Sequence, residues 1–145
     1  MSTKPILLEE AIDLIFRDAI NKAEENIISY RAGRLPDSSN LVSAKNGEID
    51  FSGHLDSNGS YHFEAEKYGA GFTVHCTAYI TEPDAVYSVK ISGSEGGGGH
   101  WENVRLKQTI HCDIKTSIIR KTKVRVDINS TAKGREFTGK IIYSI

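Results

Sequence analysis

The chain has 145 residues and a mass of 16.0 kDa, which predicts a single domain (residues 1–145) that can bury a core without disulfide or metal staples. A hydrophobic content of 39% and only 3 prolines favour a globular domain over a disordered chain. The net charge of −1 excludes a strong overall attraction to nucleic acid or to an anionic membrane.

Charge is unevenly distributed along the chain. Residues 1–101 carry 15 acidic and 8 basic side chains, a net charge of −7, whereas residues 102–145 carry 4 acidic and 10 basic side chains, a net charge of +6. The last third is therefore a basic segment attached to an acidic body. We expect such a segment to suit an acidic protein partner.

The N-terminus has neither the basic region nor the apolar stretch of a secretory signal, and no apolar run approaches the roughly 18 residues of a membrane span. We therefore expect a cytoplasmic protein. In that compartment the two cysteines, Cys76 and Cys112, are predicted to be free thiols rather than a disulfide.

Residues 4–32 are predicted to form one long helix, capped by Thr3 and ended by Gly33. Apolar side chains recur there with the helical period and form one stripe. The stripe consists of Leu8, Ile12, Ile15, Ala19, Ala23 and Ile27, widened by Phe16 and Ile20. We expect it to pack on a sheet; the alternative is a homodimer formed through this helix.

Residues 47–145 alternate apolar and polar side chains with a period of two, which predicts antiparallel strands with one buried face. We count about seven strands joined by short turns. The simplest arrangement is a meander, curled into a sandwich, a roll or a partly closed barrel, with the helix on its apolar face. The predicted fold class is therefore α+β. The last turn, at Lys133-Gly134, would pair the two strands that flank it and set Asp127 beside Lys140.

The stretch "HLDSNGSYH", residues 54–62, is predicted to be a hairpin turn. A three-residue loop ending in a left-handed Gly59 keeps apolar residues on one face of both flanking strands. In that register His54 lies opposite His62.

The turn that follows would place His62 opposite His75, so that His54, His62 and His75 form a row across three strands. Neighbouring strands lie about 4.8 Å apart, so such a row could share a zinc ion, with Glu64 supplying a carboxylate oxygen. The alternatives are a polar, solvent-facing patch and a pH-responsive cluster.

The stretch "SGSEGGGGHW", residues 92–101, predicts a glycine-rich loop that lacks the pattern of a phosphate loop. Such a loop, ending in His100 and Trp101, could close over a sugar or a flat ring stacked on the indole. The alternative is a hairpin connection after which Trp101 packs inward.

The stretch "KTSIIRKTK", residues 115–123, connects two predicted strands without any Gly, Pro, Asn or Asp. It places Ile118 and Ile119 at or near a tip. The surrounding cations are Lys115, Arg120, Lys121, Lys123 and Arg125. An apolar tip ringed by cations suits the pocket of a protein partner or an anionic membrane surface. The alternative is that the strands continue and bury both isoleucines.

A wider set of basic side chains points outward in the predicted strands. It consists of Arg105, Lys107, Lys123, Arg125 and Lys140. Asp113 and Asp127 interrupt it, and no aromatic side chain stacks between the cations, which disfavours nucleic acid as the ligand.

No nucleophile elbow, phosphate loop or dinucleotide-binding glycine pattern occurs in the sequence. Cys76 and Cys112 alternate inward, away from the outward His75 and His111, so they cannot act as Cys–His pairs. We therefore expect a small non-enzymatic binding module for a protein partner, with an immunity- or antitoxin-like role as one form. The alternatives are a zinc protein built on the histidine row and a β-domain that binds a sugar or an anionic membrane.

Overall fold

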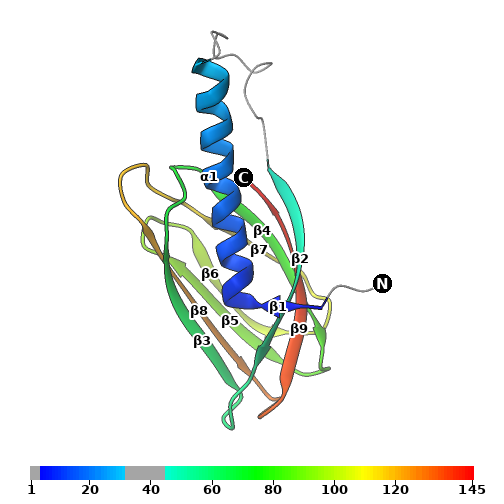
Figure 1. Ribbon diagram of the computed structural model, residues 1–145. Coiled ribbons are helices and arrows are strands. Elements are labelled where there is room, and N and C mark those ends of the chain that lie inside the picture. Colours follow the sequence, from blue (N-terminus) through cyan, green and yellow to red (C-terminus); the bar gives the residue numbers. More distant parts are fainter. Residues whose placement is uncertain (1–3, 32–44) are drawn as a thin grey trace.

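A computed structural model describes residues 4–31 and 45–145 (Figure 1). Within these ranges it contains one helix and nine strands, which confirms the α+β class. In chain order the elements are β1 (Ile6–Leu7), α1 (Leu8–Arg31), β2 (Asn46–His54), β3 (Ser60–Lys67), β4 (Val74–Glu82), β5 (Tyr87–Gly93), β6 (Gly98–Val104), β7 (Ile110–Ile114), β8 (Thr122–Ser130) and β9 (Glu136–Ser144).

The strands form two sheets that pack face to face as a sandwich and do not close into a barrel. The first sheet has the order β1-β2-β9-β4-β7, and the second has the order β3-β8-β5-β6. Every pair of neighbours is antiparallel except β1 and β2, which run parallel. The inward faces of both sheets supply the apolar core.

The predicted meander is wrong. From β2 onward, every connection except the one between β5 and β6 crosses from one sheet to the other. Asp127 accordingly lies opposite His62 and Lys90, not Lys140. A turn that joins two sheets keeps apolar residues inward just as well as a hairpin turn does, so the alternation of side chains could not distinguish the two.

The alternation of apolar and polar residues over 103–116 does not form one strand: β6 ends at Val104 and β7 begins at Ile110. Two residues near the break, Asn103 and Lys107, have left-handed backbones with φ values of 55° and 60°. The side-chain oxygen of Gln108 accepts the Arg105 N–H at 3.1 Å, and Lys107 donates its N–H to the Ile80 carbonyl at 2.8 Å. These local hydrogen bonds replace a strand ladder, so the chain changes sheets here.

The helix closes the side of the sandwich between β2 and β3 (Figure 1). It begins at Leu8 rather than residue 4, because Ile6 and Leu7 are extended and pair with β2. The stripe is buried in the core from Leu8 to Ala19, whereas Ile20 is 37% exposed. Thr3, Gly33 and the side chain of Ile27 lie outside the described part. Within that part, no helix is long and apolar enough to cross a membrane.

Aromatic rings fill the middle of the core. Phe137 is fully buried and makes edge contacts with Phe51 and Tyr61, with ring centroids 6.3 and 5.2 Å away. These rings occupy the space over two strand glycines: an added Cβ would lie 2.6 Å from Phe137 at Gly53 and 2.4 Å from Phe51 at Gly139.

Candidate functional site

The stretch "HLDSNGSYH" is a turn that carries the chain from the first sheet to the second. A side-chain oxygen of Asp56 accepts the N–H groups of Asn58 and Ser60 at 2.8 and 3.0 Å, and these bonds lower the pKa of the carboxyl group. Gly59 is left-handed as predicted, with a φ of 82°, and its carbonyl accepts the Ser130 N–H at 2.7 Å. The turn is therefore fastened to β8 rather than folded into a hairpin.

The structure does not bring the three predicted histidines together. His54 ends β2 opposite Glu136, and β9 lies between β2 and the strand that carries His75. His62 belongs to the other sheet. His75 instead hydrogen-bonds to Asp113 at 2.8 Å. The row fails because both registers on which it depended are wrong.

Glu64, the fourth predicted ligand, faces cations instead. Its carboxylate oxygens lie 3.8 Å from Lys123 Nζ and 3.8 Å from Arg125 Nη1. Among the side chains that the structure describes, no group of three or more His, Cys, Asp or Glu is arranged to hold a metal ion. The geometry therefore lends no support to the zinc alternative.

His100 and Trp101 point to opposite faces of β6 and do not share a site. Trp101 pairs with the buried Val89 and packs against the core, with its ring over Gly99. His100 is exposed on the outer face, 3.5 Å from a carboxylate oxygen of Glu102. The arrangement matches the alternative in which the glycine run is a hairpin connection and Trp101 packs inward. This hairpin joins β5 to β6, and β6 already begins at Gly98, inside the glycine run.

The basic segment does not build a continuous basic face. Arg125 is bound to Asp127 at 2.9 Å, and this hydrogen bond raises the pKa of the guanidinium. Lys140 lies on the other sheet, 3.7 Å from Glu48 and 3.9 Å from Asp50. The basic strands β8 and β9 are central strands, so each is flanked by strands of the acidic body. The positive charge of the segment is thus offset in part within the sheets, by the ion pairs of Lys123, Arg125 and Lys140.

Three connections gather at one end of the sandwich, which we call the loop end (Figure 1). They are the β3–β4 loop (residues 68–73), the β5–β6 turn (94–97) and the β7–β8 loop (115–121). Ile118 and Ile119 lie in the last of these and are 69% and 81% exposed, the highest values for any large hydrophobic side chain in the described part of the chain.

Hydrogen bonds from the β3–β4 loop hold this exposed segment from one side. The Tyr68 hydroxyl donates to the Ile118 carbonyl at 2.5 Å, and the Thr116 hydroxyl donates to the Phe72 carbonyl at 2.7 Å. Within the segment, the Ile119 N–H donates to the Ser117 hydroxyl at 3.1 Å. The two isoleucines are therefore presented by an ordered backbone.

The β5–β6 turn holds the same segment from the other side. The Arg120 guanidinium binds Glu95 at 2.8 Å, and the Lys115 N–H donates to the Gly96 carbonyl at 3.0 Å. Ser94 and Lys123 exchange two further hydrogen bonds of 2.8 and 3.0 Å. Sequence reasoning missed Tyr68, Ser94 and Glu95, because nothing near them in the chain indicates that they contact residues 115–123.

The charge at the loop end is positive. Lys115 and Lys121 are exposed and have no ion-pair partner among the described residues, whereas Arg120 is paired with Glu95. The described part of this end therefore combines two exposed isoleucines with uncompensated cations.

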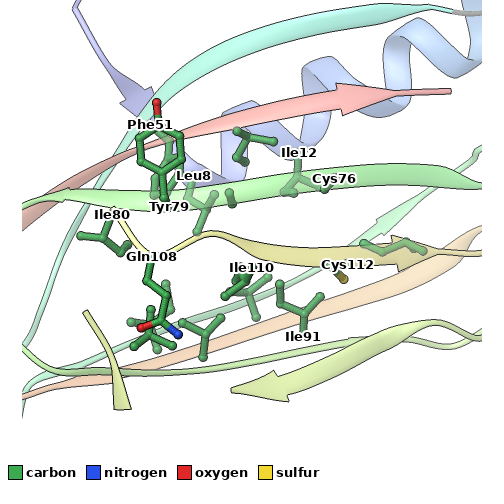
Figure 2. Close-up of a pocket in the computed structure, with 17 residues that line it drawn as sticks. Leu8, Ile12, Phe51, Cys76, Tyr79, Ile80, Ile91, Gln108, Ile110 and Cys112 are labelled. Carbon is green, nitrogen blue, oxygen red and sulfur yellow. The ribbon is translucent and has the colours of Figure 1, made fainter. Parts of the chain in front are cut away.

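A cavity of about 70 Å³ lies inside the sandwich, under α1 (Figure 2). Apolar side chains such as Ile12, Ile80 and Ile110 line it, together with Cys76 and Cys112. An engineered apolar cavity of about 150 Å³ takes up benzene, and ordinary ligand pockets measure about 300–1,000 Å³. This cavity is too small for a sugar.

No protein-family model matches the chain, and no curated protein has a matching sequence. Among solved structures, the chain resembles the Yersinia pseudotuberculosis-derived mitogen, with 10% identity and a TM-score of 0.45 over 70% of this chain and 87% of that one. It also resembles the P-domain of Macrobrachium rosenbergii nodavirus, with 10% identity and a TM-score of 0.41 over 70% of this chain and 91% of that one. Such likenesses carry no information about function.

Proposed function

We propose that this chain is a small non-enzymatic binding module that docks a protein partner at the loop end. The observation that carries the proposal is the pair Ile118 and Ile119, which are 69% and 81% exposed on an ordered backbone. A partner-neutralising role of the immunity or antitoxin kind would use such a surface.

The energetics favour recognition at this tip. Covering an isoleucine side chain contributes about 1.5–3 kcal/mol, and an ordered loop loses little conformational entropy when a partner binds. Stable interfaces bury about 1,000 Å² or more, so we expect Tyr68 and the β5–β6 turn to join the contact. The free charges of Lys115 and Lys121 favour an acidic rim on the partner.

The strand order also supports binding at the loop end. Setting aside the short β1, the orders β2-β9-β4-β7 and β3-β8-β5-β6 are those of an eight-stranded jelly roll, and we infer that fold. Rigid sheets of this kind commonly present their binding residues on the loops at one end.

The test compares three forms of the full chain: wild type, Ile118→Ser/Ile119→Ser, and Ile142→Ser. Ile142 is a matched control because it is also exposed (41%) but lies on the outer face of the first sheet. Each form is immobilised and incubated with extract of the source organism, and bound proteins are quantified by mass spectrometry. A parallel arm measures sedimentation with vesicles of phosphatidylcholine alone or with phosphatidylglycerol.

We expect a protein that binds wild type and Ile142→Ser, is lost from the double variant, and binds more weakly at high salt. Binding to phosphatidylglycerol vesicles that the double variant loses, without any such protein, would replace the proposal with membrane attachment. A protein retained by all three forms, or no specific binding at all, would rule out the loop end as the contact.

A further inference from the structure

The two cysteines lie directly opposite each other on neighbouring strands. Cys76 of β4 is the register partner of Cys112 of β7 in an antiparallel pair. Such partners have Cα atoms about 4.5–5.5 Å apart, and disulfides span Cα separations of about 4.4–6.8 Å. The backbone therefore already has a separation that a disulfide needs, and both thiols are free.

Both side chains point into the sandwich, where there is room for them to move. They line the apolar cavity together with Ile91 and Ile110 (Figure 2). In a densely packed core a change of side-chain rotamer displaces neighbouring atoms. Here both cysteines line a cavity with a free volume of about 70 Å³, which reduces the displacement that a rotamer change requires.

The edge position of β7 allows a small reagent to reach the buried thiols when this strand opens locally. Among the strands that the structure describes, β7 is a five-residue edge strand that pairs in its sheet with β4 alone. Beyond its ladder with β4, an isolated bridge between Gly97 and Ile114 and the Lys115–Gly96 hydrogen bond link its C-terminal end to the other sheet. Short edge strands open locally at a lower free-energy cost than central strands do. Such an opening exposes Cys112, and Cys76 beside it is only partly buried.

We propose that Cys76 and Cys112 form a reversible cross-strand disulfide when the protein meets a low-molecular-weight disulfide such as oxidised glutathione. The thiolate of one cysteine attacks a sulfur of glutathione disulfide, which forms a mixed disulfide and releases one glutathione. The thiolate of the other cysteine attacks the protein-side sulfur and releases the second glutathione. Two electrons pass from the protein to glutathione, and the two thiol protons end on the released glutathione thiols.

The reaction is expected to be slow but stabilising. Burial raises the pKa of Cys76 to about 12 and that of Cys112 to about 11, so the closed sheet contains little thiolate. Exchange therefore proceeds through the opening of β7. Once formed, the bond fastens this strand to β4, and β7 leads directly into the loop that carries Ile118 and Ile119.

The test equilibrates the full chain in glutathione buffers that range from reduced to oxidised. Intact mass spectrometry after acid quenching should show the loss of two hydrogen atoms, reversed by dithiothreitol, and peptide mapping should join the two cysteine-containing peptides. Hydrogen exchange of the β7 amides should slow by more than about tenfold in the oxidised form. Cys76→Ala and Cys112→Ala are the controls, and neither should lose the two hydrogens.

If no disulfide forms in the native protein, the cause is either slow access of glutathione to the buried thiols or an unfavourable equilibrium. A refolding experiment distinguishes these two causes. Wild type is unfolded in guanidinium and refolded in the same oxidised buffer, so that both thiols are exposed before the sheet forms. Native protein that still carries two free thiols would overturn the proposal. A product consisting only of glutathione adducts or intermolecular dimers would overturn it as well.

Discussion

The hydroxyl of Tyr87 donates a hydrogen bond to the carbonyl of Pro83 at 2.8 Å. Tyr87 is the first residue of β5 and is fully buried, and Pro83 immediately follows β4 in the other sheet. The bond therefore bridges the crossing between the two sheets, in the manner of the tyrosine corners of other sandwiches.

Replacing Tyr87 by Phe should lower the free energy of unfolding by about 1–2 kcal/mol, because it leaves the Pro83 carbonyl without its donor. Urea unfolding would measure the change. Tyr68→Phe is the matched comparison: it also removes one hydroxyl-to-carbonyl bond, but at an exposed position, and should cost less. Equal losses in the two variants would contradict this explanation.

Thr122→Val should stabilise the protein by about 1 kcal/mol. Thr122 is fully buried, and its hydroxyl has no hydrogen-bond partner among the described residues, so a methyl group of similar shape removes an unsatisfied polar atom. Thermal unfolding should show a higher Tm. Thr81→Val provides the opposite case, because the Thr81 hydroxyl is bonded to Thr138 at 2.8 Å, and its Tm should fall.

Gly139→Ala should lower the free energy of unfolding by about 1–3 kcal/mol. The added Cβ would meet both the ring of Phe51 at 2.4 Å and the backbone carbonyl of Tyr79 at 2.5 Å, and a backbone atom cannot move aside cheaply. Gly99→Ala should cost less, because the atoms in its way are at the far end of the partly buried Trp101 ring. Chemical denaturation of both variants checks the order.

Alkaline pH should destabilise the reduced protein through its cysteines. Their pKa values are raised by burial, so between about pH 9 and 11 the unfolded chain loses these protons while the folded chain keeps them. Stability is then full below about pH 9 and falls as pH rises, because the unfolded chain gives up thiol protons that the folded chain keeps. Denaturant unfolding under reducing conditions measures the slope, which Cys76→Ala/Cys112→Ala should flatten.

The sequence predicted directions of side chains well and partners of strands poorly. Its alternation placed Cys112 inside and His111 outside, and its helical period identified the buried stripe that begins at Leu8. These are local properties, set by the period of one element. The partner of β3 is β8, more than 50 residues away, and no local period encodes that choice.

In the candidate site, too, local features could be predicted from the sequence and contacts between distant segments could not. The composition of residues 115–123 was enough to locate an apolar tip, because it lacks the residues that usually make tight turns. The ion pair between Glu64 and Arg125 was not foreseeable, because it depends on which strands become neighbours. The basic segment therefore looked like a free surface in the sequence, whereas in the structure Lys123, Arg125 and Lys140 face carboxylates of neighbouring strands.

The position of β9 has a consequence for how the chain is made. β9 comes after every other strand in the chain, yet it lies in the middle of the first sheet, between β2 and β4. During synthesis on the ribosome, β2 must therefore wait without its antiparallel neighbour until residues 136–144 have emerged. Folding of the first sheet therefore depends on the synthesis of β9, and a product that stops before residue 136 would lack a central strand of that sheet rather than an edge strand.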